Sequence, residues 1–112
     1  MTEAEFESTI YQLAKLYGWK RYHTHRSDRS ESGFPDDCLV RGKRIIFAEL
    51  KKEKGRLSAN QYDWLVALEA TGLVEVALWR PSMLDEIVAI LGPQQKRATL
   101  VLPEKRPAPR RR

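Results

Sequence analysis

The chain has 112 residues, which fits one domain and is too short for two. Apolar residues make up 42% of it and charged residues 31%, enough apolar material for a globular core. The single cysteine, Cys38, excludes an intramolecular disulfide and a multi-cysteine zinc site, and it fits a reducing compartment. No apolar run approaches the roughly 20 residues of a membrane helix, and the acidic start lacks signal-peptide features, so we expect a cytoplasmic protein without a membrane segment.

The net charge of +5 is unevenly distributed along the sequence. Residues 103–112 contain five basic residues and one acidic residue, so this stretch accounts for four of the five net charges. We therefore expect a single domain over residues 1–102, followed by a disordered basic Pro/Arg-rich tail over 103–112. Such a tail fits a nucleic-acid partner and a solvated chain end equally well.

The first half of the chain predicts a helix, a strand, a loop and a hairpin. Thr2 and Glu5 have capping-box spacing before apolar residues at helical intervals, so residues 3–17 read as a helix. Residues 19–25 read as a strand, and the serine-rich stretch 26–33 reads as a loop. Residues 35–40 and 43–51 are two extended runs around Gly42, which is typical of a hairpin.

The second half predicts two more helices around one strand. Ser58 and Gln61 form a second capping box, which opens a helix that runs to about residue 71. The apolar run 74–80 predicts a strand. Ser82 is expected to cap a third helix that stops at Gly92, and residues 99–102 form an optional last edge strand. The order αβββαβα, with an optional final β, predicts an α/β fold with a mixed sheet flanked by helices.

The hairpin carries the most informative residues. Side chains alternate between the faces of a strand, so Glu49 and Lys51 point the same way. If Gly42 is the first central residue of a type II′ turn, Asp36 falls opposite Glu49. Directly opposed residues have Cβ atoms roughly 4.5 to 5.5 Å apart, so the two carboxylates are close enough to share one cation.

Two carboxylates this close repel each other unless one takes up a proton or a cation lies between them. Mg²⁺ prefers hard oxygen ligands with retained waters, and Mn²⁺ accepts similar sets. Lys51 could orient a water or offset charge on a phosphate. The alternative is an ordinary cross-strand ion pair. Because these charges end the apolar strand segment 45–48, where unpaired charges are costly, the functional interpretation is favoured.

The ordered set of motifs resembles the VRR-NUC branch of the PD-(D/E)xK nucleases, notably small stand-alone members of phages and prophages. It consists of Gly33-Phe34-Pro35-Asp36, Glu49-Leu50-Lys51, Gly55-Arg56-Leu57-Ser58 with Gln61, and Trp79-Arg80-Pro81. The resemblance implies a restriction-endonuclease-like core and a Mg²⁺- or Mn²⁺-dependent endonuclease that hydrolyses DNA phosphodiester bonds by nicking or with selectivity for branched or junction DNA. A phage or prophage origin would place the protein in the cytoplasm of a bacterial host cell. A catalytically inactive DNA-binding or assembly module with the same fold is the alternative.

The resemblance also implies roles for individual residues. Asp36 and Glu49 correspond to the metal ligands and Lys51 to the catalytic amine. The family carries a further glutamate on its first helix, which here is Glu3, Glu5 or Glu7. Glu3 is favoured as catalytic residue and metal ligand because it lies on the apolar stripe of that helix, whereas Glu5 is accounted for by the capping box. Gln61 is both a capping residue and a candidate catalytic residue.

Further residues are candidates for DNA contacts and assembly. His23 and His25 share a strand face, where a structural or phosphate-facing role is favoured over metal ligation. The basic candidates for contacts to the DNA backbone are Arg26, Arg29, Lys52, Lys54 and Arg56. One site of this kind acts on one strand, so cleavage of both strands or of a junction calls for a homodimer with two-fold symmetry.

Overall fold

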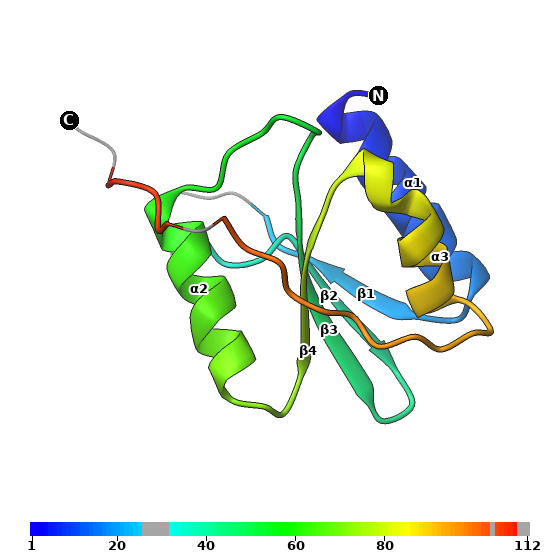
Figure 1. Ribbon diagram of the computed structural model, residues 1–112. Coiled ribbons are helices and arrows are strands. Elements are labelled where there is room, and N and C mark those ends of the chain that lie inside the picture. The colour runs from blue at the N-terminus through cyan, green and yellow to red at the C-terminus, as the bar shows by residue number, and fades with distance from the viewer. Residues whose placement is uncertain (26–31, 104, 110–112) are drawn as a thin grey trace.

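The computed structural model describes residues 1–25, 32–103 and 105–109 (Figure 1). Its elements confirm the predicted order αβββαβα, with one short 3₁₀ helix added. They are α1 (Glu3–Leu16), β1 (Lys20–His23), β2 (Asp37–Arg41), β3 (Arg44–Leu50), α2 (Ala59–Ala70), β4 (Glu75–Trp79), η1 (Pro81–Met83) and α3 (Leu84–Leu91). In this part of the chain, no helix is long and apolar enough to cross a membrane.

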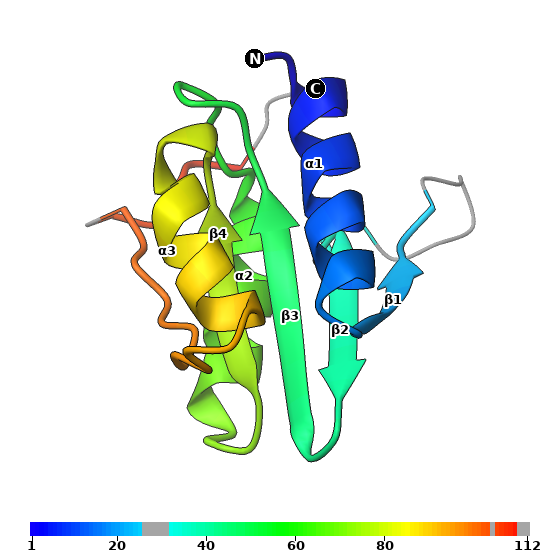
Figure 2. The ribbon, with the colours of Figure 1, turned by 90° about the vertical axis from the view of Figure 1, so that its right-hand side faces the viewer.

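The four strands form one mixed sheet in the order β1-β2-β3-β4. Strand β2 is antiparallel to β1 and to β3, whereas β3 and β4 are parallel. The parallel pair needs a crossover connection, which α2 provides. Helices α1 and α3 lie on one face of the sheet and α2 on the other, which gives three layers (Figures 1 and 2). The predicted fold class, a mixed sheet flanked by helices, is therefore confirmed.

The hairpin between β2 and β3 has the predicted register. Arg41 lies opposite Arg44, and the ladder continues to Asp37 opposite Ala48. Gly42 has a φ of +59°, whereas Lys43 is not among the positive-φ residues, as a type II′ turn requires. This register brings Asp36, immediately before β2, next to Glu49.

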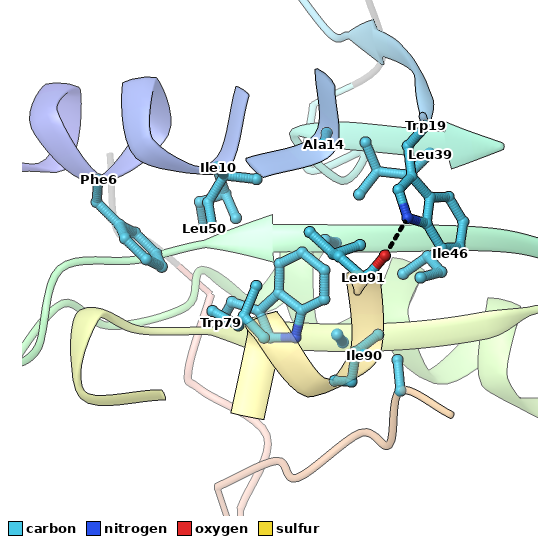
Figure 3. Packing of buried hydrophobic residues seen from close by; sticks show 14 residues of the cluster. Phe6, Ile10, Ala14, Trp19, Leu39, Ile46, Leu50, Trp79, Ile90 and Leu91 are labelled. Carbon is cyan, nitrogen blue, oxygen red and sulfur yellow. Dashed lines mark hydrogen bonds between the residues drawn. The ribbon is translucent and has the colours of Figure 1, made fainter. Parts of the chain in front are cut away.

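The main core lies between the sheet and the pair α1 and α3 (Figure 3). Trp79 and Ile46 of the sheet and Phe6 of α1 are fully buried in it. Trp19 closes one end, where its Nε1 donates a hydrogen bond of 2.9 Å to the carbonyl of Leu91. Arg41 donates to the same carbonyl through Nη1 at 2.7 Å, so the last turn of α3 is capped by side chains.

A second, smaller apolar cluster lies between the sheet and α2. It contains Leu57, Leu65, Val76 and Leu78, with the partly buried Leu100 and Leu102 packed against it. The optional edge strand over residues 99–102 is not formed. Just before this segment, the amide of Ala98 donates to the carboxylate of Glu75 at 2.9 Å, a side-chain partner in place of a ladder partner.

The prediction that Ser82 caps the third helix is wrong. The chain enters α3 through η1, and neither helix has a side-chain cap. The amide and Oγ of Ser82 instead donate to the carboxylate of Glu53, at 2.8 and 2.7 Å. The Ser82 hydroxyl thus donates to a carboxylate from the loop after β3, whereas the oxygen of a capping serine accepts from a helix amide.

Gly33 lies against the first turn of α2. Its φ of +93° is strained for any other residue, and a Cβ added there would lie 2.6 Å from the backbone carbon of Asn60. Asn60 also donates through Nδ2 to Oγ of Ser32 at 2.6 Å. This close approach joins the segment before Asp36 to the helix that carries Gln61.

We expect Gly33→Ala to lower the free energy of unfolding by about 1–3 kcal/mol more than Gly18→Ala does, as measured by urea denaturation. Gly18 is the matched control, because its φ of +79° imposes similar strain while a Cβ there would meet nothing within 4 Å. Equal losses for the two variants would show that the contact with Asn60 contributes nothing.

Candidate active site

Glu49 and Lys51 lie together where β3 ends, on the face that carries α2. The Glu49 side chain is buried, with 1% of the residue exposed. Its Oε2 accepts a hydrogen bond from Nε2 of Gln61 at 3.1 Å and lies 3.6 Å from Nζ of Lys51. Its Oε1 is buried and has no hydrogen-bond partner among the described residues. One oxygen of Glu49 is thus held by the protein, and the other is free to bind a ligand.

Asp36 is fixed beside Glu49 by backbone contacts on both sides. The amide of Thr24 donates to the carbonyl of Asp36 at 2.8 Å, and the Thr24 hydroxyl donates to that of Pro35 at 2.8 Å. Oδ2 of Asp36 accepts from the amide of Leu50 at 2.8 Å. These bonds place the carboxylate close enough to hydrogen-bond a protonated Glu49.

Two aromatic contacts support this segment from the side of α2. The ring of Phe34 meets the rings of Phe47 and Trp64 edge-to-face, with centroids 5.7 and 5.1 Å apart. Phe47 lies on the site face of β3, and Trp64 belongs to α2. The aromatic anchor therefore fixes the approach to Asp36 from the two elements that also hold Glu49 and Gln61.

The electrostatics of the pair favour a bound cation. Burial and the neighbouring charge of Asp36 raise the pKa of Glu49 to about 8, although Lys51 acts in the opposite direction. Without a cation, Glu49 thus tends to be protonated near neutral pH. A divalent ion would stabilise the ionised form of both carboxylates.

The residues present fit a divalent metal with few protein ligands. Asp36 and Glu49 supply hard oxygen donors, and Oε1 of Glu49 is buried without a hydrogen-bond partner, as is Oδ2 of Asp37 on the other face of the sheet. The described residues contain no group of three or more His, Cys, Asp or Glu placed to hold a metal. The donor set therefore suits an ion that keeps several waters, such as Mg²⁺ or Mn²⁺.

Asp37, the neighbour of Asp36, points to the opposite face of the sheet and has partners of its own. It is fully buried, and its Oδ1 lies 2.9 Å from Nη2 of Arg21 and 3.0 Å from Nδ1 of His23. Burial raises the pKa of Asp37, while His23 and Arg21 oppose that shift. These contacts join His23 to Asp37, whereas His25 is exposed.

The glutamates of α1 differ in their surroundings. Glu3 is exposed, and no hydrogen bond or ion pair joins it to Asp36 or Glu49 within the described residues. Glu5 forms the predicted capping box with Thr2. Glu7 contacts His23, with its Oε1 2.9 Å from Nε2, and so joins the cluster around Asp37. The structure therefore brings Asp36, Glu49, Lys51 and Gln61 together, and it does not add Glu3 to them.

The structure describes three of the five candidate DNA-binding residues. Lys52, Lys54 and Arg56 are exposed in the loop after β3, directly beyond Lys51. Arg26 and Arg29 lie outside the described residues. In the tail, Arg106 makes a two-pronged contact with Asp63 of α2, at 2.7 and 2.8 Å.

Arg80 is a contributor to the site region that sequence reasoning did not single out, although it belongs to the Trp79-Arg80-Pro81 motif. It follows β4 and donates hydrogen bonds to backbone carbonyls of the loop beyond Lys51. The available signal was an arginine directly after a fully buried strand that pairs in parallel with the strand ending in Glu49 and Lys51.

A raised pKa of Glu49 predicts a specific pH dependence of stability. Below about pH 4.5, its ordinary pKa, the group adds its full stabilisation, and this is lost as the pH rises to about 8. With a metal chelator present, the free energy of unfolding of wild type should therefore fall, relative to that of Glu49→Gln, by up to about 1.4 kcal/mol per pH unit across this range. Urea denaturation at several pH values measures this difference. The exposed Glu69, changed to Gln, should leave the wild-type slope unchanged. Parallel curves for wild type and Glu49→Gln would contradict the raised pKa.

The chain is similar in fold to a protein of known structure. The chain is similar to Hjc of Archaeoglobus fulgidus, a Holliday junction resolvase from a hyperthermophilic archaeon, with 26% sequence identity and a TM-score of 0.51. The similarity covers 69% of this chain and 67% of the resolvase chain. No family model matches the sequence, and no curated protein matches it. The mixed sheet flanked by helices is thus a fold similar to that of a Holliday junction resolvase.

Proposed function

We propose that this chain is a metal-dependent nuclease that hydrolyses DNA phosphodiester bonds and selects its substrate by DNA structure. The observation that carries the proposal is the meeting of Asp36, Glu49 and Lys51 at the end of β3, with one buried Glu49 oxygen left without a partner. Two carboxylates and an amine at one point form a set suited to phosphodiester hydrolysis. The motifs assign the chain to the VRR-NUC branch of the PD-(D/E)xK nucleases in this proposal.

The structural comparison supports a branched substrate. The similar protein from Archaeoglobus fulgidus is named as a Holliday junction resolvase. A four-way junction differs from duplex DNA in shape rather than in base sequence. The basic residues Lys52, Lys54 and Arg56 lie on an exposed loop beside Lys51, where they suit contacts to the phosphate backbone.

In the proposed mechanism, Asp36 and Glu49 would hold a Mg²⁺ or Mn²⁺ ion. The ion would polarise the phosphate and lower the pKa of a water. Gln61 holds one oxygen of Glu49, and the Leu50 amide holds one oxygen of Asp36, so both carboxylates are oriented before the substrate binds. Lys51 lies beside Glu49 and carries the positive charge that offsets charge developing on the phosphate.

Cleavage assays on plasmid, single-stranded and four-way-junction DNA in Mg²⁺ or Mn²⁺ test the proposal. Wild type should cut at least one of them, and Glu49→Ala and Lys51→Ala should each lower the rate by about 100-fold or more. Matched controls are Glu69→Ala, exposed on α2, and Lys43→Ala, exposed at the far end of the hairpin. Both should retain wild-type rates.

Calorimetry with Mn²⁺ completes this test. Binding should be present in wild type and Lys51→Ala and lost in Asp36→Asn. The hydrolase proposal fails if wild type shows no cleavage that is lost in Glu49→Ala and in Lys51→Ala. Metal binding without cleavage would then indicate an inactive DNA-binding or assembly module.

We also propose that the protein acts as a homodimer, because one such site cuts one strand and a junction presents two equivalent strands. Sedimentation at micromolar concentration should show a dimer, alone or with junction DNA. A monomer under both conditions would contradict this proposal. In the same picture, the basic tail over residues 103–112 adds attraction to phosphates.

A further inference from the structure

The loop after Lys51 is tied to the end of the neighbouring strand by one arginine. Nη1 of Arg80 donates to the carbonyls of Lys52, Glu53 and Gly55, at 2.8, 3.1 and 2.8 Å. The loop itself is irregular, and the described backbone bonds give it one internal bond, from the Gly55 amide to the Lys52 carbonyl at 2.9 Å. The two N–H groups of one guanidinium nitrogen are thus shared among three carbonyls that lie outside the helices and strands, of which that of Lys52 also accepts from the Gly55 amide.

Two further contacts join the same parts of the chain. The amide of Lys51 donates to the carbonyl of Trp79 at 3.0 Å, which extends the parallel pairing of β3 and β4 by one residue. The carboxylate of Glu53 accepts from the amide and hydroxyl of Ser82. Residues 79–82 therefore hold the loop over residues 51–55 in place through hydrogen bonds.

This loop in turn limits where the amine of Lys51 can lie. A Cβ added at Gly55 would lie 3.5 Å from Cδ of Lys51 and 3.2 Å from Cγ of Lys52, so the Gly55 backbone packs beside the Lys51 stem. Free lysine side chains have many rotamers, and fixing one costs up to about 2 kcal/mol. A loop that is already fixed beside Lys51 restricts its rotamers before the substrate binds, and so lowers this entropic cost of binding.

We propose that Arg80 is a positioning residue that, by holding the carbonyls of residues 52, 53 and 55, fixes the loop against Lys51 and so sets the place of its amine. This inference rests on the proposed function, in which Lys51 acts on the phosphate. Arg80 acts through the loop and through Lys51. Lysine cannot fully replace it, because its nitrogen lies one bond closer to the backbone and cannot reach all three carbonyls.

The first test compares kinetic constants of Arg80→Met, Arg80→Lys and a control, Arg97→Met. The side chain of Arg97 is 69% exposed, lies 3.9 Å from the carboxylate of Glu75 and does not touch the loop, so the control reports the loss of one positive charge away from the loop. Arg80→Met should lower kcat by about 10-fold or more, since misplacing a catalytic group by about 1 Å can cost 100-fold. Its KM should stay within about 3-fold of that of Arg97→Met, and Arg80→Lys should recover part of kcat. A fall confined to KM would indicate a simple DNA contact and overturn the proposal.

The second test needs no activity and uses hydrogen exchange of the free protein. Exchange of the Gly55 amide should be at least about 10-fold faster in Arg80→Met than in Arg97→Met, while amides of β3 and β4 keep wild-type protection. If Arg80→Met does not fold, Arg80→Lys must show an intermediate exchange rate and an intermediate kcat. Wild-type values for Arg80→Lys on both counts, or an unchanged Gly55 amide in Arg80→Met, would overturn the proposal.

The two tests separate this inference from the proposed function. If the Gly55 amide exchanges faster in Arg80→Met but wild type cuts no DNA, Arg80 holds the loop and the proposed nuclease function is refuted. Cleavage by wild type with unaltered Gly55 exchange in Arg80→Met would support the nuclease and refute the role of Arg80.

Discussion

The burial of Glu49 beside Asp36 is the constraint on which the rest of the site depends. A carboxyl group removed from water is costly to ionise, and a second carboxyl next to it adds to that cost. The fold nevertheless holds this position rigidly, through the hairpin register, the bond from Gln61 and the close contact at Gly33. A domain of this size has little stability to spare, so this placement is unfavourable unless a cation binds there, as we propose.

The neighbouring acids Asp36 and Asp37 have different partners on the two faces of the sheet. On the α1 face, Asp37 meets Arg21 and His23, and Glu7 closes the cluster from the helix. On the α2 face, Asp36 and Glu49 have an amide, a glutamine and a lysine, and no guanidinium from the residues that the structure describes. An arginine there would already neutralise the pair. Among the described residues, the candidate site therefore has a lysine where the other face has an arginine, although one buried oxygen on each face, Oε1 of Glu49 and Oδ2 of Asp37, has no hydrogen-bond partner.

Local signals made most of the fold predictable, whereas long-range side-chain partners were not predictable. The capping boxes at Thr2 and Ser58 and the turn at Gly42 act over three or four residues, so sequence spacing alone identified them. Ser82 also has the form of a cap, but Glu53 from a distant loop binds its donors instead. The role of Arg80 was hidden for the same reason, since its partners are backbone carbonyls, which have no sequence signature. Of the candidate site, the pairing of Asp36 with Glu49 followed from the hairpin register, and Lys51 from the alternation of side chains along a strand. Gln61 was a candidate through its capping box and the family resemblance, whereas the choice among the glutamates of the first helix depends on how α1 packs.

The turn at Gly42 makes the hairpin sensitive to length rather than to composition. One residue inserted between Gly42 and Arg44 would shift the register of β2 and β3 by one residue. Because side chains alternate along a strand, this shift would exchange the two faces of β2 relative to β3. Asp37 would then enter the site, and Asp36 would face the arginine and histidine on the other side. Homologues should therefore vary freely at the exposed position 43 while keeping the spacing between Asp36 and Glu49 constant, and a library with insertions in this turn would lose the site before it lost the sheet.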